Sequence, residues 1–158
     1  MYPFEETFSC FVVLIRSLSE DLFLASMNGW SPRDVVAHLV GWNSLMRLSC
    51  QDILQGKPPA YYADAANDYR DINAGFVARF ASRDRETLLE ELIGSKQVLV
   101  IFLQTVDPAE WEADHGVEHH SGGPATVARV LASLEHDYLD HTRQIETWLR
   151  ENQSDQAD

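Results

Sequence analysis

The residues best placed to do chemistry are Asp137 and His141, which lie in a long patterned stretch from Pro124 to Asn152. Apolar residues in this stretch follow the 3-and-4 spacing of one helix face, and His141 takes a step where an aliphatic side chain is expected. Asp137 precedes it by four residues, so both side chains can aim at one point. Two interpretations stay open, an intrahelical ion pair and a share in a divalent-metal site.

His136 and Asp140 have the same four-residue spacing, but they lie on a different arc of the helix. Arg129 and Arg143 share that arc, which indicates that it faces solvent. We therefore expect His136 and Asp140 to form a solvated surface pair, and His136 to make no contribution to a buried site.

Three further histidines, His115, His119 and His120, fall between Asp114 and Gly123, where neither helix nor strand periodicity is present. A loop that leads into the final helix can cover the mouth of a site inside a bundle. Three histidines in six residues can also bind metal adventitiously. We expect the simpler alternative, a flexible polar loop, because no regular ligand spacing joins them.

The elements that must position Asp137 and His141 are helices, since no stretch alternates convincingly with period two. Four long helices are predicted: Phe4 to Leu22, Pro32 to about Gly56, Ser82 or Asp84 to Val106, and Pro124 to Asn152. A shorter helix from about Asp64 to Phe80 and a short turn from Asp107 to Trp111 are predicted between them. All six prolines lie in loops or at helix starts, which supports this division.

The predicted fold is all-α, an antiparallel four-helix bundle with one or two short extra helices. Its longest connection joins the second and third long helices. We expect residues 1–152 to form a single bundle domain and residues 153–158 to form a disordered acidic tail. Ser31, Pro32 and Asp34 together have the pattern of a capped helix start, and Asn28-Gly29 is the expected end of the first helix.

Composition narrows the classes of partner. The chain has 158 residues and a formal net charge of −13, which argues against nucleic-acid or anionic-membrane partners because both need a basic surface. No run approaches membrane-spanning length and no secretory signal is present, so a cytoplasmic location is expected. Cys10 and Cys50 lie in apolar helical patterns, which favours reduced core thiols over a disulfide.

Three stretches resemble a known family. Residues 28–42, N-G-W-S-P-R-D-V-V-A-H-L-V-G-W, resemble the segment G-W-(S/T)-x-x-(D/E)-h-h-A-H-L-h-x-W of the DinB/YfiT-like bundle superfamily, where h is apolar. D-I-N at residues 71–73, S-R-D-R-E-T-L-L at 82–89 and Ser95 are similar to the branch named after ClbS and DfsB. E-H-D-Y-L-D-H-T-R-Q-I at 135–145 resembles the terminal helix of that branch, and the whole resemblance spans Phe4 to Leu149.

The resemblance implies a divalent-metal site built from one histidine of the second long helix and an H-x-x-x-H pair of the last. His38 matches the first of these ligands and His141 the last, whereas Asp137 stands where the usual pattern has histidine. Two imidazoles and a carboxylate still suit a divalent ion and leave positions open for water and substrate. The added negative charge favours harder ions such as iron(II) or manganese, with zinc and nickel as alternatives.

The resemblance also implies an activity, that of a metal-dependent hydrolase or thiol-dependent transferase acting on a small electrophilic molecule. In such an enzyme the ion lowers the pKa of a bound water or thiol. Tyr138 is the candidate catalytic proton donor, although a tyrosine on a bundle stripe is more often part of the core. Trp42, Tyr61 and Tyr62 either line an apolar substrate cavity beside His38 or pack in the core.

Two alternatives remain. The first is a ClbS-like protein that binds a reactive small molecule and gives resistance without metal. The second is a non-catalytic bundle that keeps Asp137 and His141 as a buried polar pair. Because related bundles often pair through their helices, the resemblance also implies a homodimer.

Overall fold

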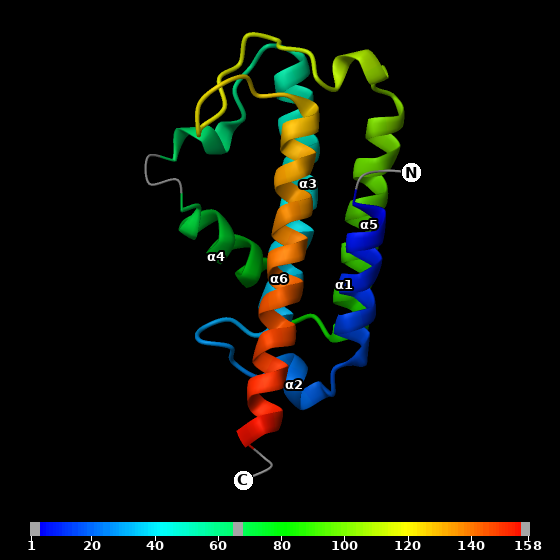
Figure 1. Ribbon diagram of the computed structural model, residues 1–158, viewed down its shortest axis with the longest axis vertical. Coiled ribbons are helices and arrows are strands. Elements are labelled where there is room, and N and C mark those ends of the chain that lie inside the picture. The colour runs from blue at the N-terminus through cyan, green and yellow to red at the C-terminus, as the bar shows by residue number, and fades with distance from the viewer. Residues whose placement is uncertain (1–3, 65–67, 156–158) are drawn as a thin grey trace.

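Four long helices form the bundle, and the computed structural model describes residues 4–64 and 68–155. The bundle helices are α1 (Glu5–Ser17), α3 (Pro32–Leu54), α5 (Arg85–Gln104) and α6 (Val127–Asp155) (Figure 1). The shorter elements are α2 (Glu20–Leu24), α4 (Arg70–Arg79) and the 3-10 helices η1 (Ala60–Ala63) and η2 (Pro108–Glu110). No strand occurs among the described residues, and the predicted all-α bundle is confirmed.

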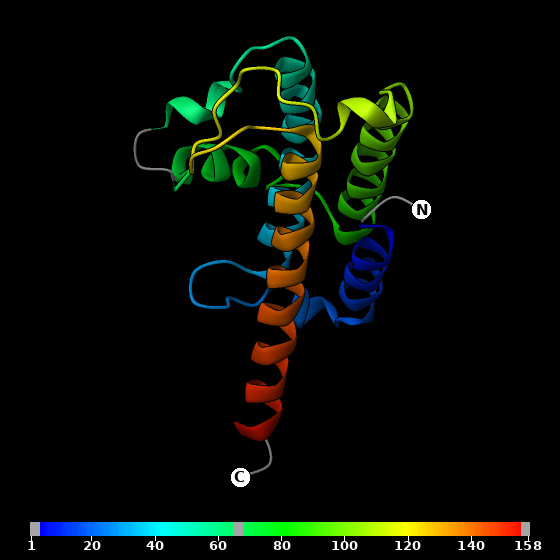
Figure 2. The same cartoon turned by 45° about the horizontal axis from the view of Figure 1, so that its top comes forward.

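The four helices run in two opposite directions (Figures 1 and 2). α1 and α6 point one way, while α3 and α5 point the other, and α3 packs against both α5 and α6. The parallel pair α3 and α5 requires a long crossover, and α4 lies in it as the predicted shorter helix, beginning at Arg70. The 3-10 helix η1 lies in the same crossover and was not predicted. Apolar faces of all four helices meet in one core that includes Phe11, Leu39, Leu99 and Ile145.

Local capping chemistry explains where α3 and α5 begin. The Ser31 hydroxyl accepts from the Asp34 backbone N–H at 3.2 Å, and the Asp34 carboxylate accepts from the Ser31 N–H at 2.9 Å. This capping box, with Pro32 at the first helical position, confirms the predicted start of α3. Asp84 caps α5 by accepting from the Thr87 N–H at 2.8 Å.

The first predicted helix is wrong in extent because it is two helices. Leu18 is extended, and Ser19 begins α2 by accepting from the Leu22 N–H at 3.2 Å. Asn28 and Gly29 do not end a helix, since α2 stops at Leu24. Both have positive φ and form a tight turn in which the Met27 N–H donates to the Trp30 carbonyl at 2.6 Å.

The last helix begins at Val127, three residues later than predicted. Pro124 instead forms an isolated bridge with Glu118, and the Thr126 hydroxyl accepts from the Arg129 N–H at 3.2 Å. α6 continues to Asp155, so residues 153–155 of the expected tail are helical, while residues 156–158 lie outside the described residues. Within the described ranges, no helix has both the length and the apolar character to cross a bilayer.

One glycine decides where α4 lies. The Phe76 ring of α4 sits directly over Gly41 of α3, and a Cβ on Gly41 would come within 2.1 Å of that ring. No residue of α4 is fully buried, and this close approach is one of its apolar contacts with the core, together with Ile72. The absence of a side chain at Gly41 therefore brings α4 close to the middle of α3.

Both cysteines are free thiols, as expected. Cys50 is buried and burial raises the pKa of its thiol to about 12, so it stays protonated in the core. Cys10 is exposed, and the expectation of a core position was wrong for it, because it lies on the outer face of α1.

Candidate metal centre

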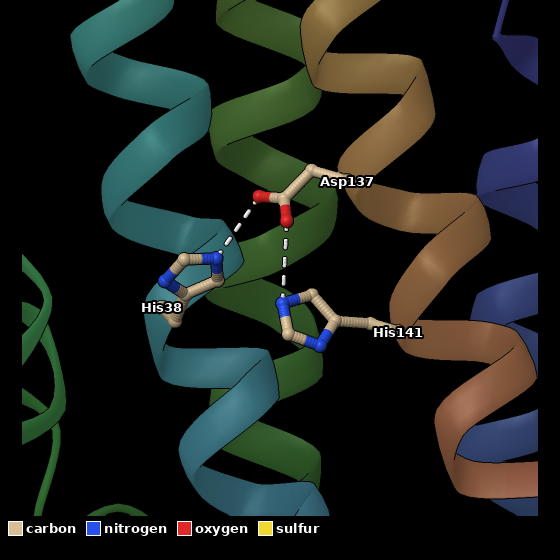
Figure 3. A group of neighbouring side chains, drawn as sticks. All are labelled: His38, Asp137 and His141. Atoms are coloured by element: carbon tan, nitrogen blue, oxygen red, sulfur yellow. Dashed lines mark hydrogen bonds and ion pairs between the residues drawn. The ribbon is translucent and has the colours of Figure 1, made fainter. Parts of the chain in front are cut away.

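Three side chains from two helices converge on one point inside the bundle (Figure 3). His38 comes from α3, and Asp137 and His141 come from α6. His38 Nε2 lies 2.9 Å from Asp137 Oδ2, and His141 Nε2 lies 3.3 Å from Asp137 Oδ1. One ligand atom from each of the three falls within 4.8 Å of the other two. The structure therefore brings together the three residues that the resemblance implied as ligands.

The cluster is sheltered by packing. His38 is buried and the other two residues are half-buried. The Trp30 indole lies 5.1 Å from the His38 ring and 6.3 Å from the His141 ring, nearly parallel to the latter. The tight turn at Asn28 and Gly29 places Trp30 there, so the turn supplies one wall of the site.

An asparagine of α4 determines which nitrogen of His38 faces the cluster. Asn73 Oδ1 accepts from Trp42 Nε1 at 2.8 Å, and an indole N–H can only donate, so the facing amide atom is oxygen. His38 Nδ1 lies 3.0 Å from the same oxygen and therefore donates to it. The Nε2 atom of His38 is thus the one turned toward Asp137.

His141 is held in the same way from its own helix. Its Nδ1 lies 3.0 Å from Gln144 Oε1, an acceptor one turn further along α6. Both imidazoles therefore commit Nδ1 to an amide oxygen and direct Nε2 at the Asp137 carboxylate. Metal-binding histidines in proteins commonly have this second hydrogen bond, which fixes the tautomer and the ring orientation.

The charges of the cluster support one another. Burial acts to raise the pKa of Asp137, but hydrogen bonds and charge from His141 and His38 outweigh it and hold that pKa well below its usual range. Burial acts to lower the pKa of His141, and the hydrogen bond and charge of Asp137 raise it overall. Asp137 is accordingly a carboxylate at neutral pH.

Two spacings in the cluster are compatible with a divalent ion, and equally with hydrogen-bonded ion pairs. Two atoms bound to one ion at about 2.1 Å each lie roughly 3.0–3.4 Å apart at the edge of a coordination polyhedron. The two contacts from Asp137 to His38 and to His141, 2.9 and 3.3 Å, are of that size. The donor set of two imidazoles and one carboxylate leaves further positions for water or substrate.

A cavity of about 300 Å³ adjoins the cluster. Its lining joins two of the cluster residues to aromatic residues of the crossover and of the loop before α6: His38, Trp42, Met46, Tyr61, Tyr69, Asn73, His120, Ser133, Leu134, His136, Asp137 and Asp140. Trp42 and Tyr61 thus line a cavity beside His38, one of the two alternatives stated for them, whereas Tyr62 lies behind Tyr61 with ring centroids 4.8 Å apart.

The loop histidines are packed rather than free. His120 lines the cavity. The His119 ring is buried, and its centroid lies 4.1 Å from that of the His120 ring. His119 Nδ1 accepts from the Ser121 N–H at 3.1 Å, and burial, followed by the charges of His120 and Arg129, lowers its pKa to about 4. His119 is therefore packed and His120 is an exposed ring at the cavity, while His115 pairs with Glu110 at 2.9 Å, away from the cavity.

Tyr138 does not reach the cluster. Its ring is fully buried against Phe8 and Phe11 of α1, with ring centroids 5.6 and 5.5 Å away. Its hydroxyl donates to Asn43 Oδ1 at 3.0 Å, and Tyr138 is not part of the cavity lining. The position of Tyr138 therefore gives no support to the proton-donor role expected for it and matches the alternative, a core tyrosine.

His136 and Asp140 form the expected exposed pair, with Nε2 and Oδ2 3.1 Å apart. Both also border the cavity at its outer side. His136 does not join the group of converging ligand atoms, in agreement with its predicted place on the solvent arc.

Sequence reasoning missed two residues that shape the cluster, Asn73 and Trp30. Each belongs to a conspicuous stretch, D-I-N and N-G-W, but neither stretch shows by periodicity that its side chain points at His38. The contact of Phe76 with Gly41 brings Asn73 within hydrogen-bonding distance of His38. The turn at Gly29 brings the Trp30 ring against His38.

Comparison with known proteins agrees with the fold and the motifs. The family model described as mycothiol maleylpyruvate isomerase N-terminal domain matches residues 25–150. An uncharacterised protein from Escherichia coli UTI89 has a similar crystal structure, with a TM-score of 0.75 and 19% identity over 95% of this chain and 90% of that one.

A second similar structure is that of the colibactin self-resistance protein ClbS in complex with a double-stranded DNA. Its TM-score is 0.73 and its identity 18%, over 91% of this chain and 89% of that one. At these identities the two structures show a shared fold. No curated protein matches the chain.

Proposed function

Because this chain belongs to the family of the mycothiol maleylpyruvate isomerase N-terminal domain, within the DinB/YfiT-like superfamily, we propose that it is a divalent-metal-dependent enzyme. The reaction we propose is hydrolysis, or transfer of a thiol, on a small electrophilic molecule. The observation that supports this most is the convergence of His38 Nε2, His141 Nε2 and the Asp137 carboxylate within 4.8 Å.

A divalent ion at this point would lower the pKa of a bound water or thiol and so supply a nucleophile near neutral pH. His38 and His141 would hold it through Nε2, and Asp137 would offset part of its charge. Asn73 and Gln144 keep both rings turned toward it through their Nδ1 hydrogen bonds.

The other residues of the site bind and shelter the substrate. Trp30 shields the two imidazoles from bulk water, and the adjoining cavity places a small molecule beside His38 and Asp137. Such shielding strengthens electrostatic interactions with the reacting atoms. No proton donor is assigned to Tyr138, because its hydroxyl is hydrogen-bonded to Asn43 in the core.

Metal analysis of the untagged protein tests the proposal. After loading with manganese, iron(II), zinc or nickel in turn and desalting, we expect about one equivalent of at least one ion per chain. His141→Ala removes a ligand and should abolish retention of the ion. The matched control His136→Ala removes an exposed imidazole of the same helix and should leave retention unchanged. Failure of the wild-type protein to bind any of the four ions would refute the proposal, and equal loss in both variants would refute the assignment of ligands.

The cavity supports a second candidate, a protein that binds a reactive small molecule without metal. Its aromatic lining is independent of any ion, and the similar ClbS structure is that of a self-resistance protein. Binding of small organic molecules in the presence of a chelator, together with no retention of any ion, would favour this candidate.

The partner expectations remain predictions. The net charge of −13 predicts no nucleic-acid partner, but the ClbS structure is a complex with double-stranded DNA, so the comparisons give that prediction no support. A mobility shift assay with duplex DNA at low salt, where electrostatic binding is strongest, tests it. The homodimer is tested by light scattering.

A further inference from the structure

One side of the cavity is an aromatic wall, made of Trp42, Tyr61, Tyr69 and His120. Its rings meet edge to face, with centroids 5.4 Å apart for Trp42 and Tyr61, 5.3 Å for Tyr61 and Tyr69, and 5.8 Å for Tyr69 and His120. Such contacts hold each ring in one orientation. The wall is therefore preformed, and it combines residues from α3, η1, the start of α4 and the loop before α6.

The backbone at Tyr69 is held in an unfavourable conformation that places its ring in this wall. Tyr69 has φ 52° and ψ 26°, the left-handed region that residues other than glycine rarely adopt. Asp64 Oδ2 accepts from the Tyr69 N–H at 3.0 Å and holds the residue there.

The charged groups that line the cavity are acidic. They are Asp137, which belongs to the cluster, and Asp140, which borders the outer side. Asp140 Oδ2 lies 3.1 Å from His136 Nε2, and its Oδ1 lies 4.0 Å from an Arg143 guanidinium nitrogen. No lysine or arginine lines the cavity within the described residues. The nearby Arg129 is turned to the carbonyls of Gly122 and Pro124, at 2.7 and 3.0 Å.

The histidine of the wall adds no positive charge. Burial, followed by the charge of Arg129, lowers the pKa of His120, so its imidazole is neutral at neutral pH. Among the described residues that line the cavity, a carboxylate or phosphate would find no lysine or arginine. An organic cation would find aromatic rings and, at the outer side, the carboxylate of Asp140, which are groups that attract it.

We propose that the part of the ligand held against the aromatic wall is an organic cation, a small ammonium group that carries an apolar body. The identity of this ligand as a substrate rests on the function proposed above, but its binding to the wall requires no metal. The structure thus assigns a substrate class with a positively charged or protonated end remote from the three converging ligand atoms, and it excludes an anionic group at that end.

Three probes of matched shape and different charge test this in the metal-free, chelator-treated protein. Benzylamine is a cation at neutral pH, benzyl alcohol is neutral and benzoate is an anion. Calorimetric titration should give binding about tenfold tighter for benzylamine than for benzyl alcohol, and weakest for benzoate. In NMR spectra the Trp42 indole N–H, which is hydrogen-bonded to Asn73, should shift on addition of benzylamine.

Variants locate the binding. Tyr69→Leu removes one ring of the wall, and Asp140→Asn removes an exposed carboxylate; each should lower the affinity for benzylamine about threefold or more and leave that for benzyl alcohol nearly unchanged. Trp148→Leu, which removes an aromatic side chain outside the cavity lining, should change neither.

Equal affinity for the three probes, tighter binding of benzoate, or no binding of benzylamine at millimolar concentration would each overturn the inference. Failure of the metal proposal has a different signature, since the protein would then retain no ion while the preference for benzylamine stayed intact. The two proposals are therefore tested separately.

Discussion

Substitution of Gly41 by alanine tests how the cluster is supported from outside the bundle. The new Cβ would lie 2.1, 2.3 and 2.4 Å from three atoms of the Phe76 ring, whereas ordinary contact begins at 3.4 Å. The ring must therefore move by about 1.3 Å, the difference between 3.4 and 2.1 Å. Because no residue of α4 is fully buried, we expect the helix to shift as a whole.

Two opposing effects set the change in stability. Replacing a helical glycine by alanine gains about 1 kcal/mol from helix propensity, and overpacking of this kind costs about 1–3 kcal/mol. Gly75 of α4 is a matched control, since a Cβ there meets nothing within 4 Å. Denaturant unfolding should show Gly75→Ala to be more stable than Gly41→Ala by about 1–3 kcal/mol, which is the overpacking cost alone.

The effect on the cluster follows from the position of Asn73, one turn before Phe76 on the same helix. A shift of about 1.3 Å lengthens its 3.0 Å contact with His38 Nδ1 beyond hydrogen-bonding distance. Loss of such a supporting bond typically lowers metal affinity about 10- to 100-fold. Calorimetric titration with the retained ion should show this loss for Gly41→Ala and not for Gly75→Ala. Equal stability and equal affinity in the two variants would refute the reasoning.

Three other substitutions give distinct outcomes. Asn73→Leu keeps the approximate size of the side chain but removes the acceptor for His38, so titration should show metal affinity lowered about 10- to 100-fold. Tyr138→Phe leaves Asn43 Oδ1 without its donor in the core, so the free energy of unfolding should fall by about 1–3 kcal/mol. Unchanged metal affinity and turnover in this variant would distinguish a structural from a catalytic tyrosine. His119 has a pKa of about 4 in the folded protein and a usual value of 6.5, so the unfolded chain takes up the proton first. The stability that depends on this neutral imidazole is therefore lost as pH falls from about 6.5 to about 4. In His119→Gln the free energy of unfolding should depend less on pH across that window. A pH dependence equal to that of the wild-type protein would show that His119 does not cause it.

Much of the fold was predictable because helix periodicity and capping are local. The starts of α3 and α5 depend on Ser31 and Asp84, whose side chains bond to backbone groups three residues away. The break between α1 and α2 was missed because the apolar spacing continues across it. Ser19 competes there with helix continuation by capping a new helix, and periodicity does not contain that signal.

The convergence at the cluster was predictable in part. The spacing of Asp137 and His141 is sufficient to put both side chains on one face of α6, while His38 required the family resemblance. Tyr138 follows Asp137 directly, and consecutive residues in a helix point about 100° apart. Asp137 therefore meets His38, whereas the Tyr138 ring packs on Phe11 of α1 with its hydroxyl on Asn43, a distinction that a broad apolar stripe does not make.

Asn73 was not identifiable because its role depends on tertiary contact. Periodicity of α4 is weak, and its position depends on tertiary contacts such as the close approach between Phe76 and Gly41. Gly41 admits the Phe76 ring in the middle of α3, and the sequence alone does not show which ring packs there.

The crossover between α3 and α5, residues 55–84, has a consequence for engineering. The metal ligands proposed here come from α3 and α6, whereas Tyr61 and Tyr69 of the cavity come from the crossover. A library that randomises selected positions of the crossover, with Asn73 and Phe76 kept, would alter the shape of the binding cavity without touching the three donors. Selectivity and reactivity can thus be optimised in separate rounds of mutagenesis in this chain.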